Sequence, residues 1–183
     1  MGHQNRNMQD MIESAVNNPT LIDERLKRWT DSSTESNIAI IKFNLKFKNG
    51  ITQKGFMLAS GGRMQFMPGM FFVENPAGGY NLYLDPLSSI NIEYEAFRVG
   101  GKDRWMDAER KLIVALETLF PLSDLEEATI ELASERPYCP SCLNNIIMKF
   151  NNKYTQLLGE NFQFYYQEGN NVRNLDDNYY ENL

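Results

Sequence analysis

The chain has 183 residues, of which 42% are hydrophobic and 12% aromatic, and its formal net charge is −6. This length and composition suffice for one domain with a buried core. The longest apolar runs are far shorter than the roughly 20 residues that cross a bilayer, so we expect no membrane span and no membrane partner. Residues 111–183 carry 5 basic and 11 acidic side chains, which argues against a broad electrostatic grip on a phosphate backbone.

Residues 1–36 show apolar positions at helical spacing on both sides of Pro19, which predicts two short helices. The polar N-terminus lacks the apolar core of a signal peptide, so we expect none in this chain. The segment is either a remnant of a connecting region or a helical cover over a sheet, and the sequence leaves both alternatives open.

A β-hairpin is predicted next. From residue 37 the apolar residues alternate, with Ile41 and Phe43 on one face and Lys42 on the other, which is typical of a half-buried strand. Asn49-Gly50 is a preferred two-residue turn because both positions can adopt positive φ. Residues 51–59 then return as the partner strand.

The remaining elements alternate between strand and helix. We expect short strands in the turn-rich segment 60–90, an extended stretch at 90–99 and a helix at 105–119 that is capped by Asp103. A strand at 127–133, a second helix at 140–152 and a last strand at 162–166 follow. The order hairpin, helix, strand, helix, strand predicts an α/β fold, a three-layer α/β/α sandwich with a mixed sheet.

The chain has two cysteines, which lie together in Cys139-Pro140-Ser141-Cys142 between a predicted strand and a helix. At a helix start both thiolates can face one ion, and the positive end of the helix favours the thiolate form. A lone C-x-x-C also fits a redox pair, half of a structural zinc site or two ordinary thiols. No further cysteine completes a four-cysteine site within this chain.

Asp107-Ala108-Glu109 opens the first predicted helix. Alone, this pattern suits any helix start, because acidic residues complement the helix dipole. Zinc deaminases, however, combine H-x-E on one helix with P-C-x-x-C on a later one, the first residue and both cysteines being zinc ligands and the Glu moving protons. Asp107 occupies the histidine position of that pattern and Glu109 the proton-shuttle position.

Two stretches resemble the deaminase domains of bacterial polymorphic toxins, which belong to the cytidine deaminase-like superfamily. They are residues 105–113 (WMDAERKLI) and residues 130–150 (IELASERPYCPSCLNNIIMKF). One such toxin family has a D-x-E-y-K-x-L helix, then a strand ending T-E-R-x-x-C-x-S-C and a helix ending near Q-F. The matching positions are Lys111, Leu112, Ser134, Glu135, Arg136, Ser141 and Phe150. The resemblance covers roughly residues 100–167.

The resemblance implies a zinc-dependent deaminase of cytidine deaminase-like fold at residues 37–167, preceded by a helical segment at 1–36 and followed by an acidic, Asn-rich tail at 168–183. It implies Zn²⁺ held by Asp107, Cys139 and Cys142, and Glu109 as the catalytic acid and base. It also implies a nucleic-acid substrate presented as a single strand or flipped base, with cytosine the expected base. A toxin of this kind is part of a longer secreted or delivered protein, acts in the cytoplasm of a target cell, and is neutralised by an immunity protein.

The sequence departs from the pattern at two positions. Pro137 precedes Tyr138 rather than standing directly before Cys139, and Asp107 replaces histidine. A carboxylate can bind zinc, but three anionic ligands should make water bound there less acidic. His3, the only histidine, lies in the polar terminus and is not expected to be a ligand.

Four further residues are candidates for substrate binding. Ser60 and Gly61 follow the second predicted strand and would lie near the pocket in this fold. Arg104 and Trp105 belong to a cation-plus-aromatic cluster that could hold a nucleotide, although the same cluster also fits a solvated helix start. Two other functions stay open: a catalytically inactive binding domain with a bracing metal, and a deaminase of free nucleosides or nucleotides.

Overall fold

The computed structural model describes residues 12–13, 16, 38–60, 70–84, 98–99, 102–103, 108–134, 146–168 and 171–174. Within them, seven strands form one sheet in the order β4-β3-β2-β1-β7-β8-β9, and two more form a separate pair, β5-β6. The strands are β1 (Ile38–Phe47), β2 (Thr52–Ser60), β3 (Met70–Glu74), β4 (Tyr80–Leu84), β5 (Arg98–Val99), β6 (Lys102–Asp103), β7 (Leu125–Ser134), β8 (Phe162–Glu168) and β9 (Asn171–Asn174). The helices are α3 (Ala108–Leu119) and α4 (Met148–Leu158), with 3-10 turns η1 (Leu122–Asp124) and η3 (Gly159–Asn161).

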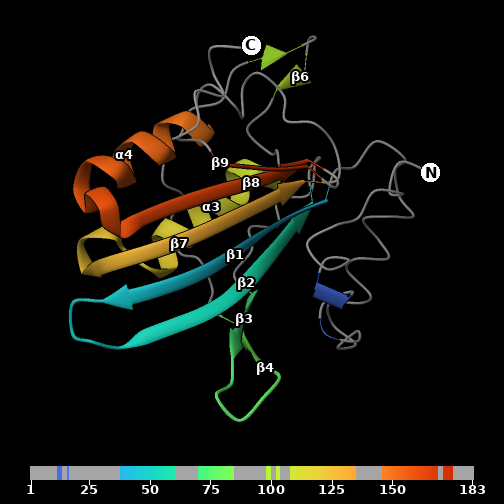
Figure 1. Cartoon of the computed structure of the whole chain (residues 1–183). Coiled ribbons are helices and arrows are strands. Elements are labelled where there is room, and N and C mark those ends of the chain that lie inside the picture. Colours follow the sequence, from blue (N-terminus) through green and yellow to red (C-terminus); the bar gives the residue numbers. More distant parts are fainter. Residues whose placement is uncertain are drawn as a thin grey trace.

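The sheet is mixed, as predicted. β7 and β8 are parallel and are connected through α4, whereas the other neighbouring pairs are antiparallel. Figure 1 shows β8, β7, β1 and β2 side by side, with the β3–β4 hairpin below them in that view. The chain is therefore an α/β protein, and its order of hairpin, helix, strand, helix, strand is the expected one.

The β1–β2 hairpin is confirmed, but its turn differs from the predicted two-residue turn. Gly50 N–H donates to Phe47 O at 2.9 Å, and Phe47 N–H donates to Ile51 O at 2.8 Å. Among the described residues of this turn, only Gly50 has positive φ, at 90°. Residues 48–50 thus form a three-residue loop with glycine at the left-handed position. The Asn49 side chain accepts the Ile51 N–H instead, at 3.0 Å, so its backbone does not need the left-handed conformation.

One face of the sheet carries the main core. Odd-numbered residues of β1, such as Ile41 and Phe43, share a single hydrophobic cluster with Leu112 and Leu116 of α3 and Phe150 of α4. Both helices therefore pack on this same face and form one layer, so α3 and α4 do not provide the two helical layers of the predicted α/β/α sandwich. Burying each such side chain contributes roughly 1.5–3 kcal/mol, so the core fixes how α3 and α4 are rotated about their axes.

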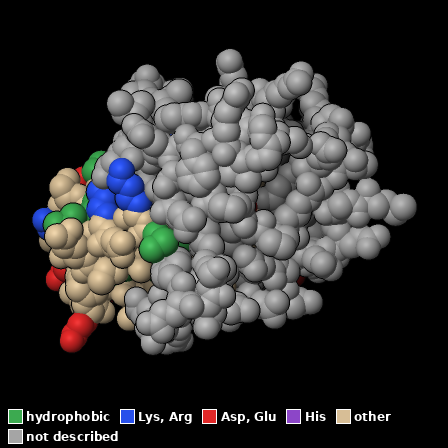
Figure 2. Space-filling view, turned by 90° about the horizontal axis from the view of Figure 1, so that it is seen from above, with side chains coloured by type: hydrophobic (Ala, Val, Ile, Leu, Met, Phe, Trp, Pro, Cys, Tyr) green, Lys and Arg blue, Asp and Glu red, His purple; other side chains and the backbone are tan. Residues whose placement is uncertain are grey.

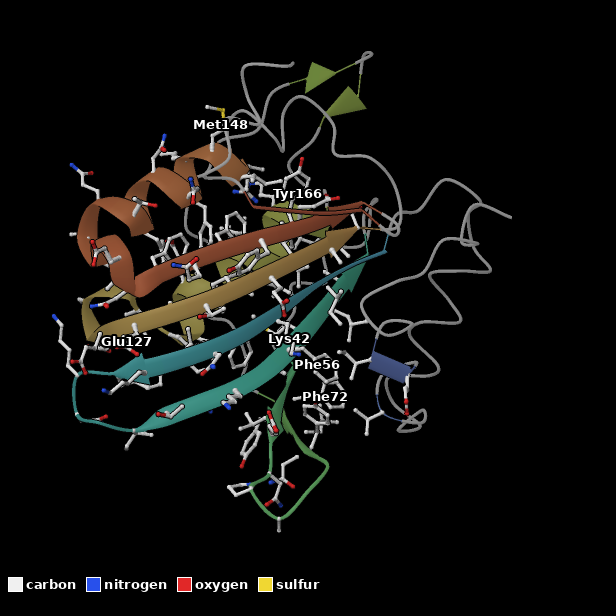
Figure 3. The ribbon with its side chains drawn as sticks, viewed as in Figure 1. Lys42, Phe56, Phe72, Glu127, Met148 and Tyr166 are labelled. Carbon is white, nitrogen blue, oxygen red and sulfur yellow. The ribbon has the colours of Figure 1, made fainter. Side chains whose placement is uncertain are left out.

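The opposite face is covered only in part. Ile12 is buried against Ile40, Phe56 and Phe72, and Figure 3 shows Phe56 beside Phe72, near the short helical segment drawn in blue. Further along this face lie charged side chains, where Lys42 Nζ is 3.9 Å from Glu131 Oε2 and the two side chains are partly exposed to solvent. The contact of Ile12 supports a covering role for the N-terminal segment.

Three details of the predicted elements are wrong. Asp103 does not cap a helix, because its backbone pairs with Arg98 in the β5–β6 pair. The second helix continues beyond residue 152 to Leu158, because Tyr154 is buried one turn after Phe150; it ends at Gly159, whose φ of 57° suits a helix C-terminus. Within the tail expected at 168–183, residues Asn171–Asn174 pair with β8.

Candidate active site

The start of α3 is held by the apolar stripe of the helix. Leu112, Ala115 and Leu116 recur at helical spacing and are 0–1% exposed. The helix ends where Phe120 N–H donates to Leu116 O at 2.8 Å, directly before Pro121, which cannot continue it. With the stripe buried against β1 and β2, the first turn of α3 has one fixed orientation over the sheet.

Glu109 lies in that first turn and is only 4% exposed. Its Oε1 accepts a hydrogen bond from Ser134 Oγ at 2.9 Å. Ser134 is the last residue of β7 and is 1% exposed. The predicted proton-shuttle residue is thus buried and hydrogen-bonded to the end of the strand that leads toward Cys139.

Glu109 is followed by two further buried charged residues, Arg110 at 2% and Lys111 at 0% exposure. Consecutive helical residues point about 100° apart, so three buried neighbours mean that the start of α3 is enclosed on most sides. Charged residues are rarely buried so deeply unless they are paired. Few water molecules can therefore surround the Glu109 carboxylate, and electrostatic interactions there are stronger than in bulk water.

The ends of three neighbouring strands, β1, β2 and β7, lie together at one end of the sheet. Ile38 of β1 pairs with Ser60, the last residue of β2, and the next residue, Ala39, pairs with Ser134. The ends of β2 and β7 are therefore separated only by β1, or roughly 10 Å at ordinary strand spacing. Because Glu109 contacts Ser134, the backbone of Ser60 lies at the same end of the sheet as the predicted acid and base.

The other predicted site residues lie outside the described residues. These are the expected zinc ligands and three of the substrate-binding candidates, Asp107, Cys139, Cys142, Gly61, Arg104 and Trp105. Their places in the chain are nevertheless informative, since Asp107 directly precedes α3 and the two cysteines fall between Ser134 and Ile146. Within the part of the chain that the structure describes, there is no group of three or more His, Cys, Asp or Glu side chains that could hold a metal.

Ser134 was not among the predicted site residues, although it matched the toxin pattern. The signal that points to it is local: the alternation of β7 ends at Leu132, after which Ala133 and Ser134 are also buried, so a small hydroxyl residue closes the strand in a buried position. A polar residue at the end of a strand that leads into a candidate ligand loop is a reasonable choice for a site residue.

The described part of the surface carries both signs of charge. Figure 2 shows Lys or Arg side chains, Asp or Glu side chains and scattered hydrophobic ones on the described portion of the face seen from above. Neither sign of charge forms a continuous patch over that portion.

Comparisons with protein-family models, with curated proteins and with solved structures found no significant match to this chain. No helix among the described residues is long and apolar enough to cross a membrane.

Proposed function

We propose that this chain is a zinc-dependent deaminase that hydrolyses the exocyclic amine of a nucleobase, with cytosine in nucleic acid as its substrate. The observation that carries the proposal is the Glu109 carboxylate. It is buried in the first turn of α3 and lies 2.9 Å from the Ser134 hydroxyl at the end of β7. A buried carboxylate at this position suits an acid and base better than a solvated residue at a helix start, which is the alternative meaning of the D-x-E pattern.

The donor set is compatible with zinc. Asp107, Cys139 and Cys142 provide one carboxylate and two thiolates, which are ligand types that zinc binds, and three protein ligands leave one position open as in catalytic sites. Zinc held there would polarise the attacking water. A purely bracing site normally closes with four protein ligands, so the count of three favours catalysis.

Glu109 would move the proton. As a carboxylate it would take a proton from the attacking water, and as the acid it would return that proton to the departing amine, so that water and substrate give ammonia and a uracil-type base. The surrounding burial limits exchange of this proton with bulk solvent. The positive end of the α3 dipole stabilises the carboxylate form, which is present before the first transfer and again after the second.

The strand order and the parallel pair β7–β8 support a cytidine deaminase-like fold, whereas the single helical layer formed by α3 and α4 does not by itself support a three-layer sandwich. Both helices lie on one face of the sheet, with the hairpin β1–β2 and the parallel pair β7–β8 beneath them. This suits a fold in which α3 and α4 begin at the same end of the sheet, the end where Glu109 and Ser134 lie. The toxin role and the immunity partner are part of the same proposal and rest on the resemblance of residues 105–113 and 130–150.

Ammonia release tests the proposal directly. The purified protein is incubated with cytosine-containing single-stranded DNA, single-stranded RNA, cytidine and CMP, and with adenine- and guanine-containing equivalents. Glu109→Ala and Glu109→Gln should abolish release while zinc content stays near that of the wild type. Glu126→Gln is the matched control, since Glu126 is an exposed carboxylate on β7, and it should keep full activity.

Each outcome has a distinct meaning. Activity on nucleosides but not on DNA or RNA would replace the nucleic-acid substrate with the free-nucleotide alternative. A zinc-loaded protein that deaminates none of these substrates would favour the inactive binding domain. Full activity in Glu109→Ala would remove Glu109 from the mechanism.

A further inference from the structure

We propose that Ser134 is a positioning residue for Glu109, fixing the orientation of its carboxylate through the Oγ to Oε1 hydrogen bond. This inference rests on the proposed function, because it concerns the group that we propose moves the proton. It goes beyond the resemblance, which matches Ser134 to a sequence pattern without giving it a role.

The strand side of this contact is held in place. The backbone of Ser134 pairs with Ala39 of β1 on one side and with Glu168 of β8 on the other. Successive side chains of a strand point to opposite faces, and Leu132 belongs to the cluster that contains α3 whereas Ala133 belongs to the cluster on the opposite face. Ser134 therefore points toward α3, as its contact with Glu109 requires.

The helix side is equally constrained. Glu109 lies three residues before Leu112, which is 0% exposed, so the backbone of the first turn cannot rotate without exposing the core. The Glu109 side chain can still vary, because the torsion angle that orients its carboxylate has a broad intrinsic distribution. A donated hydrogen bond at 2.9 Å narrows that freedom and selects one plane for the carboxylate.

Orientation matters because a general acid or base acts only within hydrogen-bond reach of the proton it transfers. Ser134→Ala removes the donor but leaves almost the same volume. We expect kcat to fall about 10–100-fold, the range seen when a partner of an active-site group is removed. KM and zinc content should change little, because Ser134 is assigned no contact with substrate or metal.

Three variants give the experiment its controls. Ser134→Thr keeps a hydroxyl and should retain most of the wild-type kcat. Ser123→Ala, which removes an exposed hydroxyl in η1, should leave kcat unchanged. Urea unfolding of the metal-free protein provides a readout that does not depend on activity: Ser134→Ala should lower the unfolding midpoint more in the wild type than in a Glu109→Ala background, since the hydrogen bond exists only in the former.

The outcomes separate the two proposals. An active wild type in which Ser134→Ala keeps full kcat, or loses affinity for substrate instead, would overturn the positioning role and leave the deaminase intact. Equal midpoint shifts in both backgrounds would also overturn it. A wild type inactive on every nucleobase substrate would overturn the deaminase and the positioning role together.

Discussion

Lys153 of α4 donates a hydrogen bond to Glu117 of α3, with Nζ and Oε2 3.1 Å apart. The Glu117 side chain is 5% exposed and that of Lys153 27%. The two helices lie on the same face of the sheet and share its core, and this ion pair joins them at the edge of that core. A charge-assisted hydrogen bond of this length is stronger than a neutral one, so the pair helps to fix the spacing between α3 and α4.

Lys153→Met should destabilise the fold. The substitution keeps the aliphatic stem but removes the ammonium group that compensates a nearly buried carboxylate, and we expect a loss of about 1.5–3 kcal/mol in the free energy of unfolding. Urea denaturation measures this change. Lys54→Met removes an exposed ammonium group on β2 and should shift stability by less than about 0.5 kcal/mol. Equal effects of the two variants would mean that the ion pair contributes nothing.

Gly55→Ala should disturb the pairing of β2 with β3. A Cβ at this position would overlap the carbonyl oxygen of Phe72 and lie 2.8 Å from the ring of Phe43. Both neighbours belong to the sheet or core and cannot move away cheaply, so we expect a loss of about 1–3 kcal/mol. Amide exchange should accelerate first in β3. Lys54→Ala, at the exposed neighbouring position of β2, should remain close to wild type in both measurements.

Ile12→Ala tests whether the N-terminal segment covers the sheet. Ile12 is 6% exposed and packs against Ile40 and Phe56, so truncation should cost about 2–5 kcal/mol. Its neighbour Glu13 is exposed, and Glu13→Ala should change stability by less than about 0.5 kcal/mol. Thermal and urea unfolding of both variants decide the question. If Ile12→Ala is as stable as Glu13→Ala, the segment is only a connecting region.

The parts of the fold that were predicted correctly have strong local periodicity. The alternation around Ile41 and Phe43 specifies β1, and the spacing of Leu112 and Leu116 specifies the buried side of α3. The predictions that failed depend on interactions with other segments. Asn171–Asn174 has no apolar alternation and forms β9 only because the edge of β8 offers unpaired backbone groups.

The candidate site likewise depends on a contact between distant segments that sequence patterns do not predict. The position of Glu109 in a first helical turn follows from sequence, but its partner Ser134 lies 25 residues further along the chain. The two meet only because α3 packs on the face of the sheet to which the Ser134 side chain points. The sequence pattern matched both residues separately, and nothing in their spacing indicates that one would donate a hydrogen bond to the other.

Tyr80 provides a test of pH dependence. Burial, and to a smaller extent the nearby Glu74 carboxylate, raise the pKa of Tyr80 above its ordinary value. The folded protein therefore holds the phenol proton more tightly than the unfolded chain, so stability from this group is complete below pH about 10 and is lost as pH rises above it.

Unfolding free energies measured from pH 9 to 11 should thus fall more steeply in the wild type than in Tyr80→Phe, which has no proton to lose. Tyr83→Phe removes a phenol from the same β3–β4 hairpin at a position that is 47% exposed and serves as the control. Parallel curves for the wild type and Tyr80→Phe would contradict the prediction.

Metal content separates a catalytic centre from a fold that only resembles one. We expect about one zinc ion per chain in the wild type, because a carboxylate and two thiolates form a three-ligand open site. Asp107→Ala and Cys142→Ala should both lose the metal, whereas Glu109→Ala should retain it, since a proton shuttle is not a ligand. Zinc retained in Asp107→Ala would mean that the carboxylate does not bind it, and the D-x-E pattern would then be an ordinary helix start. A wild type without zinc would leave Glu109 and Ser134 as a buried polar contact that joins α3 to β7, and the proposed chemistry would be abandoned.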